Sequence, residues 1–280
     1  MRLAISNIAW ETVEDEVVAT TLSRLGIDAI DIAPGKYFPG PTAVRDDDIA
    51  RVRNWWATRG IEITGMQALL FGTTGLNVFG PPDTQSAMLQ HLTAVARIAS
   101  GLGAKRLVFG SPRNRDRTGL SAEEAIDRAA TFFRRLGGVA ESYGVVFCLE
   151  PNPVCYGANF MTTSAETADV VARIAHPAIR MQLDTGAITL NGEDVGSTIE
   201  KYAHLFGHVH ISEPELVCLG DGRTDHAAVD LALRKWLPNS VISIEMLTAK
   251  DEPTLSAISR AIGTAKRYYQ NIGLGQSTHD

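Results

Sequence analysis

Short apolar runs alternate with longer amphipathic segments along the whole chain. Apolar residues recur at every second position in the short runs, as in strands, and at helical spacing in the longer segments. We expect strands at residues 3–9, 28–33, 61–68, 105–111, 145–150, 179–184, 205–211 and 240–246. We expect helices near residues 14–25, 46–59, 84–101, 121–143, 164–175, 194–204, 226–236 and 253–271. The pattern therefore predicts eight strand-helix units in succession.

Several boundaries carry residues that start or end helices. Asp83 precedes an amphipathic run, Ser121 and Glu124 have the spacing of a capping box, and Thr163 offers a hydroxyl cap. Glycines stand where helices should stop, at Gly26, Gly60, Gly101, Gly103 and Gly144. Because no break in composition separates the units, we expect a single (β/α)8 TIM barrel over residues 1–272 and a short tail at 273–280.

The chain has 280 residues and a formal net charge of −6. This acidic balance argues against a nucleic-acid partner or an anionic membrane surface, because both attract basic proteins. No apolar stretch approaches the roughly 20 residues that span a bilayer, and Met1 leads almost directly into the first strand. We therefore expect a cytoplasmic protein without a membrane partner, whose cysteines are reduced.

Four of the expected strands end in a residue that can bind a metal ion. These residues are Glu150, Asp184, His210 and Glu245. Period-two alternation puts each of them on the side of its strand that carries small or polar residues. Because the carboxyl ends of parallel barrel strands meet at one rim, we expect the four side chains to gather there. Three carboxylates and one imidazole suit Mn²⁺, Mg²⁺ or Co²⁺, so the pattern predicts a divalent metal site.

The segments around these four residues resemble those of a known family. They are Leu149-Glu150-Pro151, Leu183-Asp184-Thr185-Gly186, His208-Val209-His210 and Ile244-Glu245. In them the chain resembles the xylose-isomerase-like barrels of sugar isomerases and epimerases, particularly ketose 3-epimerases and related keto-sugar and inosose lyases. The resemblance implies one divalent ion, Mn²⁺ ahead of Mg²⁺ or Co²⁺, held by Glu150, Asp184, His210 and Glu245. It also implies that Glu150 and Glu245 are catalytic, one removing a proton beside a carbonyl and the other returning it.

Three places near these segments depart from the epimerase pattern. Ala187 stands where the family commonly has a histidine that touches substrate. A second acidic residue that the family has shortly after the first metal glutamate is missing here, where the chain has Asn152 and Tyr156. The family often has an arginine after the metal histidine, but this chain has Glu215-Leu216-Val217 at that place. The first expectation is a metal-dependent isomerase or epimerase of a ketose or keto sugar. A metal-dependent lyase or dehydratase of a keto sugar, keto glycoside or keto cyclitol stays open, since it also begins with proton removal beside a carbonyl.

Two loops at the carboxyl rim are longer than a barrel requires. Residues 69–82 follow the third strand and residues 212–225 follow the seventh. Long loops at this rim commonly cover an active site, so we expect the first loop to fold over the mouth of the barrel. Within it, Phe71 and Phe79 should supply an apolar wall that could accept a group larger than a simple ketohexose.

Polar and aromatic residues near the rim are candidates for contacts with a sugar-like substrate. The candidates are Asn7, Trp10, Gln67, Asn152, His208, Glu213 and His226. We expect an uncharged polyol or keto sugar, because no cluster of cations can be placed at the rim beyond Arg113 and Arg223. A phosphate group would need a dedicated clamp.

Two further functions are open on the same fold. An abasic-site DNA endonuclease would assemble three zinc ions from more histidines, including at positions where this chain has Gln67, Ser111 and Ala187. A non-catalytic sugar-binding barrel would not need the acid/base pair, yet all four metal-type residues are present. Exchange of a substrate proton with solvent separates an enzyme from a pure binder. Assembly into a homo-oligomer also stays open.

Overall fold

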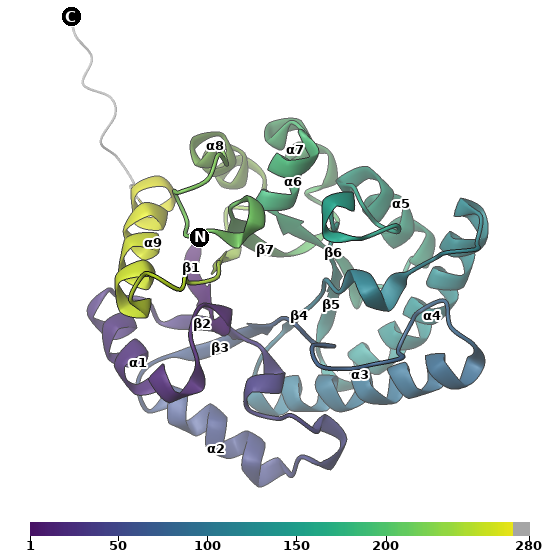
Figure 1. Ribbon diagram of the computed structural model, residues 1–280, viewed down its shortest axis with the longest axis horizontal. Coiled ribbons are helices and arrows are strands. Elements are labelled where there is room, and N and C mark those ends of the chain that lie inside the picture. Colours follow the sequence, from purple (N-terminus) through teal and green to yellow (C-terminus); the bar gives the residue numbers. More distant parts are fainter. Residues whose placement is uncertain (271–280) are drawn as a thin grey trace, which may run out of the picture.

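The computed structural model describes residues 1–270. Its eight parallel strands pair in sequence order, and the last strand pairs with the first, so the sheet closes into a barrel. The strands are β1 (Arg2–Ser6), β2 (Ala29–Ile32), β3 (Glu62–Met66), β4 (Arg106–Phe109), β5 (Val146–Leu149), β6 (Ile179–Asp184), β7 (Phe206–Ser212) and β8 (Val241–Glu245). Figure 1 shows these strands at the centre with the helices around them. The predicted (β/α)8 TIM barrel is confirmed.

The helices form the outer layer of the barrel (Figure 1). The described residues contain nine α-helices: α1 (Asp15–Arg24), α2 (Asp46–Ala57), α3 (Pro82–Leu102), α4 (Ala122–Tyr143), α5 (Ser164–Ile174), α6 (Thr185–Asn191), α7 (Val195–Tyr202), α8 (His226–Trp236) and α9 (Thr254–Tyr269). Short 3-10 helices occupy Asn7–Ala9, Thr12–Glu14, Pro34–Lys36, Pro41–Ala43, Pro112–Arg115, Val154–Tyr156 and Pro214–Leu216. Within residues 1–270, none of the helices has the length and apolarity to cross a membrane.

Two elements differ from the expected pattern. Residues 7–9 form a 3-10 helix instead of prolonging the first strand, because the Ser6 hydroxyl accepts a hydrogen bond from the backbone N–H of Ile8 and turns the chain. Helix α6 was not predicted. It starts directly after β6, where the Asp184 carboxylate accepts a hydrogen bond from the backbone N–H of Ala187 and caps it.

Two expected helix boundaries were also wrong. Helix α3 begins at Pro82, so Asp83 lies in its first turn and does not cap it. Gly101 lies inside α3 instead of ending it. A Cβ atom there would lie 2.8 Å from Cγ2 of Ile49, so the glycine allows α3 to pack closely on α2. The helix ends at Gly103, which has a φ of +89°.

The predicted caps of α4 and α5 are confirmed. Ser121 and Glu124 form the reciprocal hydrogen bonds of a capping box, and the Thr163 hydroxyl accepts from the backbone N–H of Glu166. These caps satisfy backbone N–H groups that have no partner inside the helix. The expected tail at residues 273–280, and the last residue of the expected final helix, lie outside the described part of the chain.

The register of β6 and β7 positions two of the metal-type residues as neighbours. Met181 pairs with Phe206 but Gln182 pairs with His208, so Gly207 is an extra residue that forms a bulge in β7. A Cβ atom on Gly207 would lie 2.8 Å from Sγ of Cys148, which explains why a glycine is needed at this point. After the bulge Asp184 pairs directly with His210, so both side chains reach the same level inside the barrel.

Candidate metal centre

The structure brings together the four metal-type residues at the carboxyl ends of the strands. One potential ligand atom from each of Glu150, Asp184, His210 and Glu245 lies within 4.8 Å of all the others. Nδ1 of His210 is 3.8 Å from Oε1 of Glu150 and 3.2 Å from Oε2 of Glu245. Ligands at about 2.0–2.3 Å from one ion are separated by distances of this order, up to about 4.5 Å for opposite pairs. The spacing therefore suits a single small cation.

Each carboxylate is anchored through one oxygen, which leaves the other for an ion. Glu245 accepts a hydrogen bond at Oε1 from Nε2 of Gln67 (2.7 Å), and Glu150 accepts at Oε2 from Nδ2 of Asn152 (3.0 Å). Asp184 accepts at Oδ1 from the hydroxyl of Ser212 (3.0 Å), in addition to capping α6. These contacts orient the ligand set from outside it, as supporting groups do around known metal sites.

Atoms that face the centre of the cluster lack partners of their own. Within residues 1–270, Oε1 of Glu150 and Nδ1 of His210 are buried and have no hydrogen-bond partner. Nδ1 of His210 is close to Oε2 of Glu245, but the two atoms are not aligned as donor and acceptor. Buried polar atoms are rarely left unsatisfied in proteins. Their arrangement around a common point therefore fits a divalent cation, which both could bind.

The three carboxylates of the cluster repel one another, and a bound cation would reduce this repulsion. Burial, followed by repulsion from Glu245, raises the pKa of Glu150 to about 7. Burial and the charges of Glu245 and Glu150 raise the pKa of Asp184 well above its usual range. Three ionised carboxylates so close together repel one another in a site that water barely reaches. A bound divalent cation would offset this repulsion and favour the ionised, ligating forms.

Gly110 gives Glu150 the space that it occupies. A Cβ atom at position 110 would lie 1.9 Å from Oε2 of Glu150, far inside van der Waals contact. Gly110 directly follows β4, and Glu150 directly follows the neighbouring strand β5. The glutamate can therefore lean over the end of β4 only because residue 110 has no side chain. This glycine was not a candidate from the sequence, where nothing distinguishes it from other loop glycines.

His208 lies one layer below the cluster and is bonded to Asp31. Its Nε2 atom donates to Oδ2 of Asp31 over 2.6 Å, and the same oxygen is 3.7 Å from Nε2 of His210. Burial raises the pKa of Asp31, but the charges of the two histidines and the hydrogen bond from His208 outweigh burial and lower it below its usual range. The Asp31 carboxylate is therefore a charged support beneath His210, and His208 is a part of that support.

Gln67, Asn152 and Glu213 are the proposed substrate residues that line cavities beside the cluster. Glu213 also organises the loop after β7, because its carboxylate accepts from the backbone N–H groups of Gly220 and Thr224, each at 2.9 Å. Hydrogen bonds from these groups and from His226 outweigh burial and lower the pKa of Glu213 to about 2. Glu213 is thus ionised, and its hydrogen bonds hold the loop after β7 in place at the edge of the site.

The other four proposed substrate residues line neither of the cavities beside the cluster. Their side chains form hydrogen bonds with other parts of the chain. These residues are Asn7, Trp10, His208 and His226. Trp10 is buried against Trp56 and donates to the carboxylate of Asp15 over 2.8 Å. The Asn7 side chain accepts from the backbone N–H of Ala33. His208 bonds Asp31, and His226 is held between Glu213 and Tyr269. The expected substrate contacts of Asn7, Trp10, His208 and His226 therefore have no support in the structure, because packing and hydrogen bonds hold their side chains away from the cavities.

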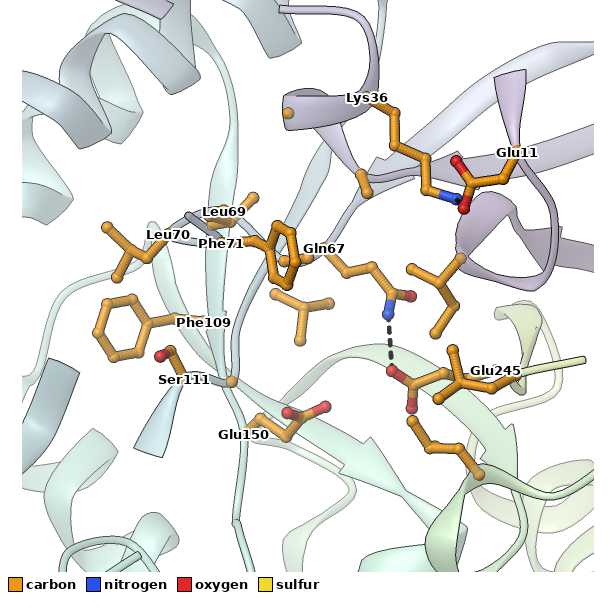
Figure 2. A pocket seen from close by; sticks show the side chains of 18 residues that line it. Glu11, Lys36, Gln67, Leu69, Leu70, Phe71, Phe109, Ser111, Glu150 and Glu245 are labelled. Carbon is orange, nitrogen blue, oxygen red and sulfur yellow. Dashed lines mark hydrogen bonds and ion pairs between the residues drawn. The ribbon is translucent and has the colours of Figure 1, made fainter. Parts of the chain in front are cut away.

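Two cavities open on the cluster. The larger has a volume of about 610 Å³ and the smaller about 220 Å³. Figure 2 shows the larger, with Glu150 and Glu245 on its floor and the Gln67 amide bonded to Glu245. Phe71 lines this cavity as expected. Phe79 does not, since its ring packs edge-on against Phe160 with centroids 5.0 Å apart.

Sequence reasoning also missed a leucine that borders both cavities. Leu216 lies in the loop after β7 and has a φ of +56°, directly after Glu215 with a φ of +61°. Residues other than glycine rarely adopt a backbone conformation with positive φ, and those that do are frequent at functional sites. No local pattern in the sequence indicates a left-handed leucine, because contacts from distant segments impose it.

Comparisons with known proteins agree with this architecture. The sequence profile of the family described as "Xylose isomerase-like TIM barrel" matches residues 20–267. D-psicose 3-epimerase of Ruminiclostridium cellulolyticum is 29% identical over 108 residues, which is 38% of this chain and 36% of that protein. That match therefore spans little more than a third of the relative.

Solved structures resemble the chain over nearly its whole length. A crystal structure of D-psicose 3-epimerase in the presence of D-fructose superposes with a TM-score of 0.79 at 17% identity, covering 97% of this chain and all of the other. The IolI protein with a bound zinc atom gives 0.75 at 18% identity, covering 96% and 98% of the two chains. At such identities the likeness concerns the fold. The family profile spans most of the barrel, and the chain belongs to the xylose isomerase-like TIM barrel family.

Proposed function

We propose that the protein is a divalent-metal-dependent isomerase or epimerase of a ketose or keto sugar. The observation that carries this proposal is the placement of Glu150 and Glu245, which both border the two cavities and flank Nδ1 of His210. Two carboxylates that face one small space can act on the same carbon. The proposed metal ligands are Glu150, Asp184, His210 and Glu245, and Mn²⁺ is the proposed ion.

The two glutamates would divide the proton transfer between them. A metal ion at this site would draw electron density from the carbonyl oxygen of the substrate and so acidify the neighbouring C–H bond. One glutamate takes the proton, and the electron pair of that bond moves into the enediol system. The other glutamate donates a proton to the opposite face of the carbon, which inverts it. Gln67 and Asn152 hold the two carboxylates in place through their hydrogen bonds.

The relatives support the same reaction class. D-psicose 3-epimerase appears both as a sequence relative and as a structural neighbour, and the IolI structure contains a metal ion, zinc. Zinc in that protein does not identify the ion here. Three carboxylates and a single imidazole form an oxygen-rich set, which favours Mn²⁺ or Mg²⁺ over zinc.

Exchange of a substrate proton with deuterated water tests the proposal. The Mn²⁺-loaded protein should incorporate deuterium beside the carbonyl of a keto sugar, and both Glu150→Gln and Glu245→Gln should abolish this incorporation while each keeps the fold. Survival of exchange in both variants, with metal retained, would exclude the acid/base roles. Exchange that is accompanied by loss of water from the substrate would instead identify the lyase alternative, which uses the same first step.

A further inference from the structure

A cavity of about 740 Å³ lies at the end of the barrel opposite the metal-type residues. It is lined by the residues that open six of the eight strands, which are Arg2, Glu62, Arg106, Val146, Phe206 and Val241. Barrel enzymes keep their active sites at the carboxyl ends of the strands. The proposed reaction therefore makes no use of this amino-terminal cavity.

Positive charge is in excess around the amino-terminal cavity. Four cationic side chains line it, and they are Arg2, Lys105, Arg106 and Arg180. The only carboxylate in the lining is that of Glu62, and Arg2 binds it over 2.6 Å while also binding Asp28 over 2.9 Å. In the part of the chain that the structure describes, the other three cations form no ion pair. Arg2 is thus a structural cation with its own partners, whereas the other three are not balanced.

Arg106 and Arg180 are held at the same point of the barrel. Nε of Arg106 donates to the carbonyl of Gly207 over 2.7 Å, and Nη2 of Arg180 donates to the carbonyls of His204 and Phe206. A Cβ atom on Gly207 would lie 2.7 Å from Cβ of Arg180, so the bulge in β7 also makes room for this arginine. Two like charges are therefore fixed beside consecutive residues at the start of β7.

Most donors of the two guanidinium groups are left without a partner. Each group has five N–H bonds. Arg106 uses Nε and Nη1, the latter to the carbonyl of Lys105 over 3.4 Å, and Arg180 uses Nη2. Within residues 1–270, Nη2 of Arg106 and both Nε and Nη1 of Arg180 form no hydrogen bond, and none of these atoms is sealed from solvent. These donors can therefore bind a ligand in the cavity.

A phosphate group matches this arrangement. A phosphate monoester carries about 1.5 to 2 negative charges at neutral pH, enough to balance both arginines, whereas a carboxylate carries one. Guanidinium groups bind phosphate oxygens through parallel N–H bonds. The volume is in the range of pockets that hold small organic ligands, and Phe206 and Trp236 add aromatic surface to the lining. The cavity can therefore hold an organic group together with its phosphate.

We propose that the amino-terminal cavity binds a phosphate group, either as the free ion or as the monoester of a small organic molecule. Arg106 and Arg180 bind the phosphate oxygens, and Lys105 adds positive charge at the edge of the cavity. The site lies at the other end of the barrel from Glu150 and Glu245, so its ligand is not the substrate of the proposed reaction. The proposal therefore stands or falls independently of the proposed function.

Isothermal titration at constant ionic strength tests the site with inorganic phosphate, phenyl phosphate and acetate, each up to about 10 mM. We expect both phosphates to bind, and acetate to bind at least about tenfold more weakly because it cannot balance both arginines. Arg180→Gln should weaken phosphate binding by about tenfold or more. Lys105→Gln changes an exposed side chain and should weaken it by about two- to fivefold. Both variants keep the metal-type residues, so phosphate bound at the carboxyl end would be unaffected.

Arg134→Gln is the matched control. Arg134 also forms no ion pair among the described residues and donates to two backbone carbonyls, those of Ile174 and Arg173, but it lies on α4 and outside the amino-terminal cavity. This variant should bind phosphate as the wild type does.

Three results would overturn the proposal: no binding of either phosphate, equal affinity for acetate, or unchanged phosphate affinity in Arg180→Gln. If Arg180→Gln does not fold, unchanged affinity in Lys105→Gln would overturn it instead. Tighter binding of phenyl phosphate than of inorganic phosphate would support the site and identify an organic ester as its ligand. Equal affinity for these two would support the site and identify the free ion.

Discussion

The Nε2 atom of Gln67 donates a hydrogen bond to Oε1 of Glu245 over 2.7 Å. This bond joins the residue after β3 to the end of β8, across the mouth of the barrel. It fixes one oxygen of the glutamate and leaves Oε2 directed toward His210, 3.2 Å from Nδ1. Gln67 is therefore a positioning residue for one of the two proposed catalytic carboxylates.

Gln67→Met should slow proton exchange by about 10- to 100-fold, the usual range for loss of a group that orients a metal ligand. Methionine has a similar length but no donor, so Glu245 would lose its anchor. The rate of deuterium incorporation and the metal content of the purified protein would be measured together. Gln90→Met, at an exposed position of α3, is the control and should change neither. An unchanged exchange rate in Gln67→Met would show that the bond is not needed.

Asp184→Asn should lower the affinity for Mn²⁺ by at least about 100-fold, since loss of a ligand should cost no less than loss of a supporting group. Asn keeps an oxygen that can still cap α6, so the change should affect the metal more than the fold. Metal content can be measured by elemental analysis, and the gain in melting temperature on adding Mn²⁺ reports binding independently.

Asp194→Asn provides a matched control for this substitution. Asp194 caps α7 as Asp184 caps α6, with a 2.8 Å bond from the backbone N–H of Ser197, but it is remote from the cluster of metal-type residues. The control should retain full metal binding. Equal metal content in the two variants would remove Asp184 from the ligand set.

Gly110→Ala should strongly reduce proton exchange, because the new Cβ atom would occupy the place of Oε2 of Glu150. The glutamate would have to swing away or the end of β4 would have to shift. Gly138→Ala is the control: Gly138 lies in α4 with no atom within 4 Å of its would-be Cβ, so alanine should stabilise the helix by roughly 0.5–1 kcal/mol. Activity and thermal unfolding of both variants would be compared. Normal activity in Gly110→Ala would contradict the close approach of Glu150.

Protonation of Glu213 at acidic pH should lower the free energy of unfolding. Its pKa falls from a reference value of 4.5 to about 2 in the folded chain, so the folded state favours the ionised form. The resulting stabilisation is complete above pH 4.5 and is lost as the pH falls from 4.5 toward 2. At neutral pH, Glu213→Gln should lower the free energy of unfolding by on the order of 2 kcal/mol.

Denaturant unfolding of the wild type and Glu213→Gln across this pH range checks the effect. The difference in unfolding free energy between the two proteins should shrink below pH 4.5. Glu200→Gln, at an exposed position of α7, should show no such difference at any pH. A gap between wild type and Glu213→Gln that stays constant down to pH 2 would rule out this source of acid sensitivity.

The sequence predicted the barrel because its signals are local and repeated. Period-two runs, amphipathic segments and caps such as Ser121 each depend on residues a few positions apart. Small errors arose where one local contact redirected the chain. The Ser6 hydroxyl ended the first strand early, and the Asp184 carboxylate started a helix that hydrophobic spacing does not indicate.

For the site, the sequence by itself determined the cluster of metal-type residues. Glu150, Asp184, His210 and Glu245 end strands with the same pleat direction, and closure of a parallel barrel brings such ends to one rim. Their proximity therefore follows from strand periodicity and barrel topology together. The close approach of Glu150 to Gly110 does not follow from the same rule, because it depends on the space between two strand ends.

Only the tertiary structure decided which other residues face the site. Trp10 and His226 have suitable chemistry, but they are held by Asp15 and by Glu213 with Tyr269, partners that sequence patterns do not reveal. Leu216 has an apolar side chain that no sequence rule marks as functional, yet a backbone hydrogen bond from the distant Leu247 helps to hold it where it borders both cavities. Side-chain direction and cavity shape depend on packing between residues far apart in the sequence, whereas strand and helix patterns depend on near neighbours.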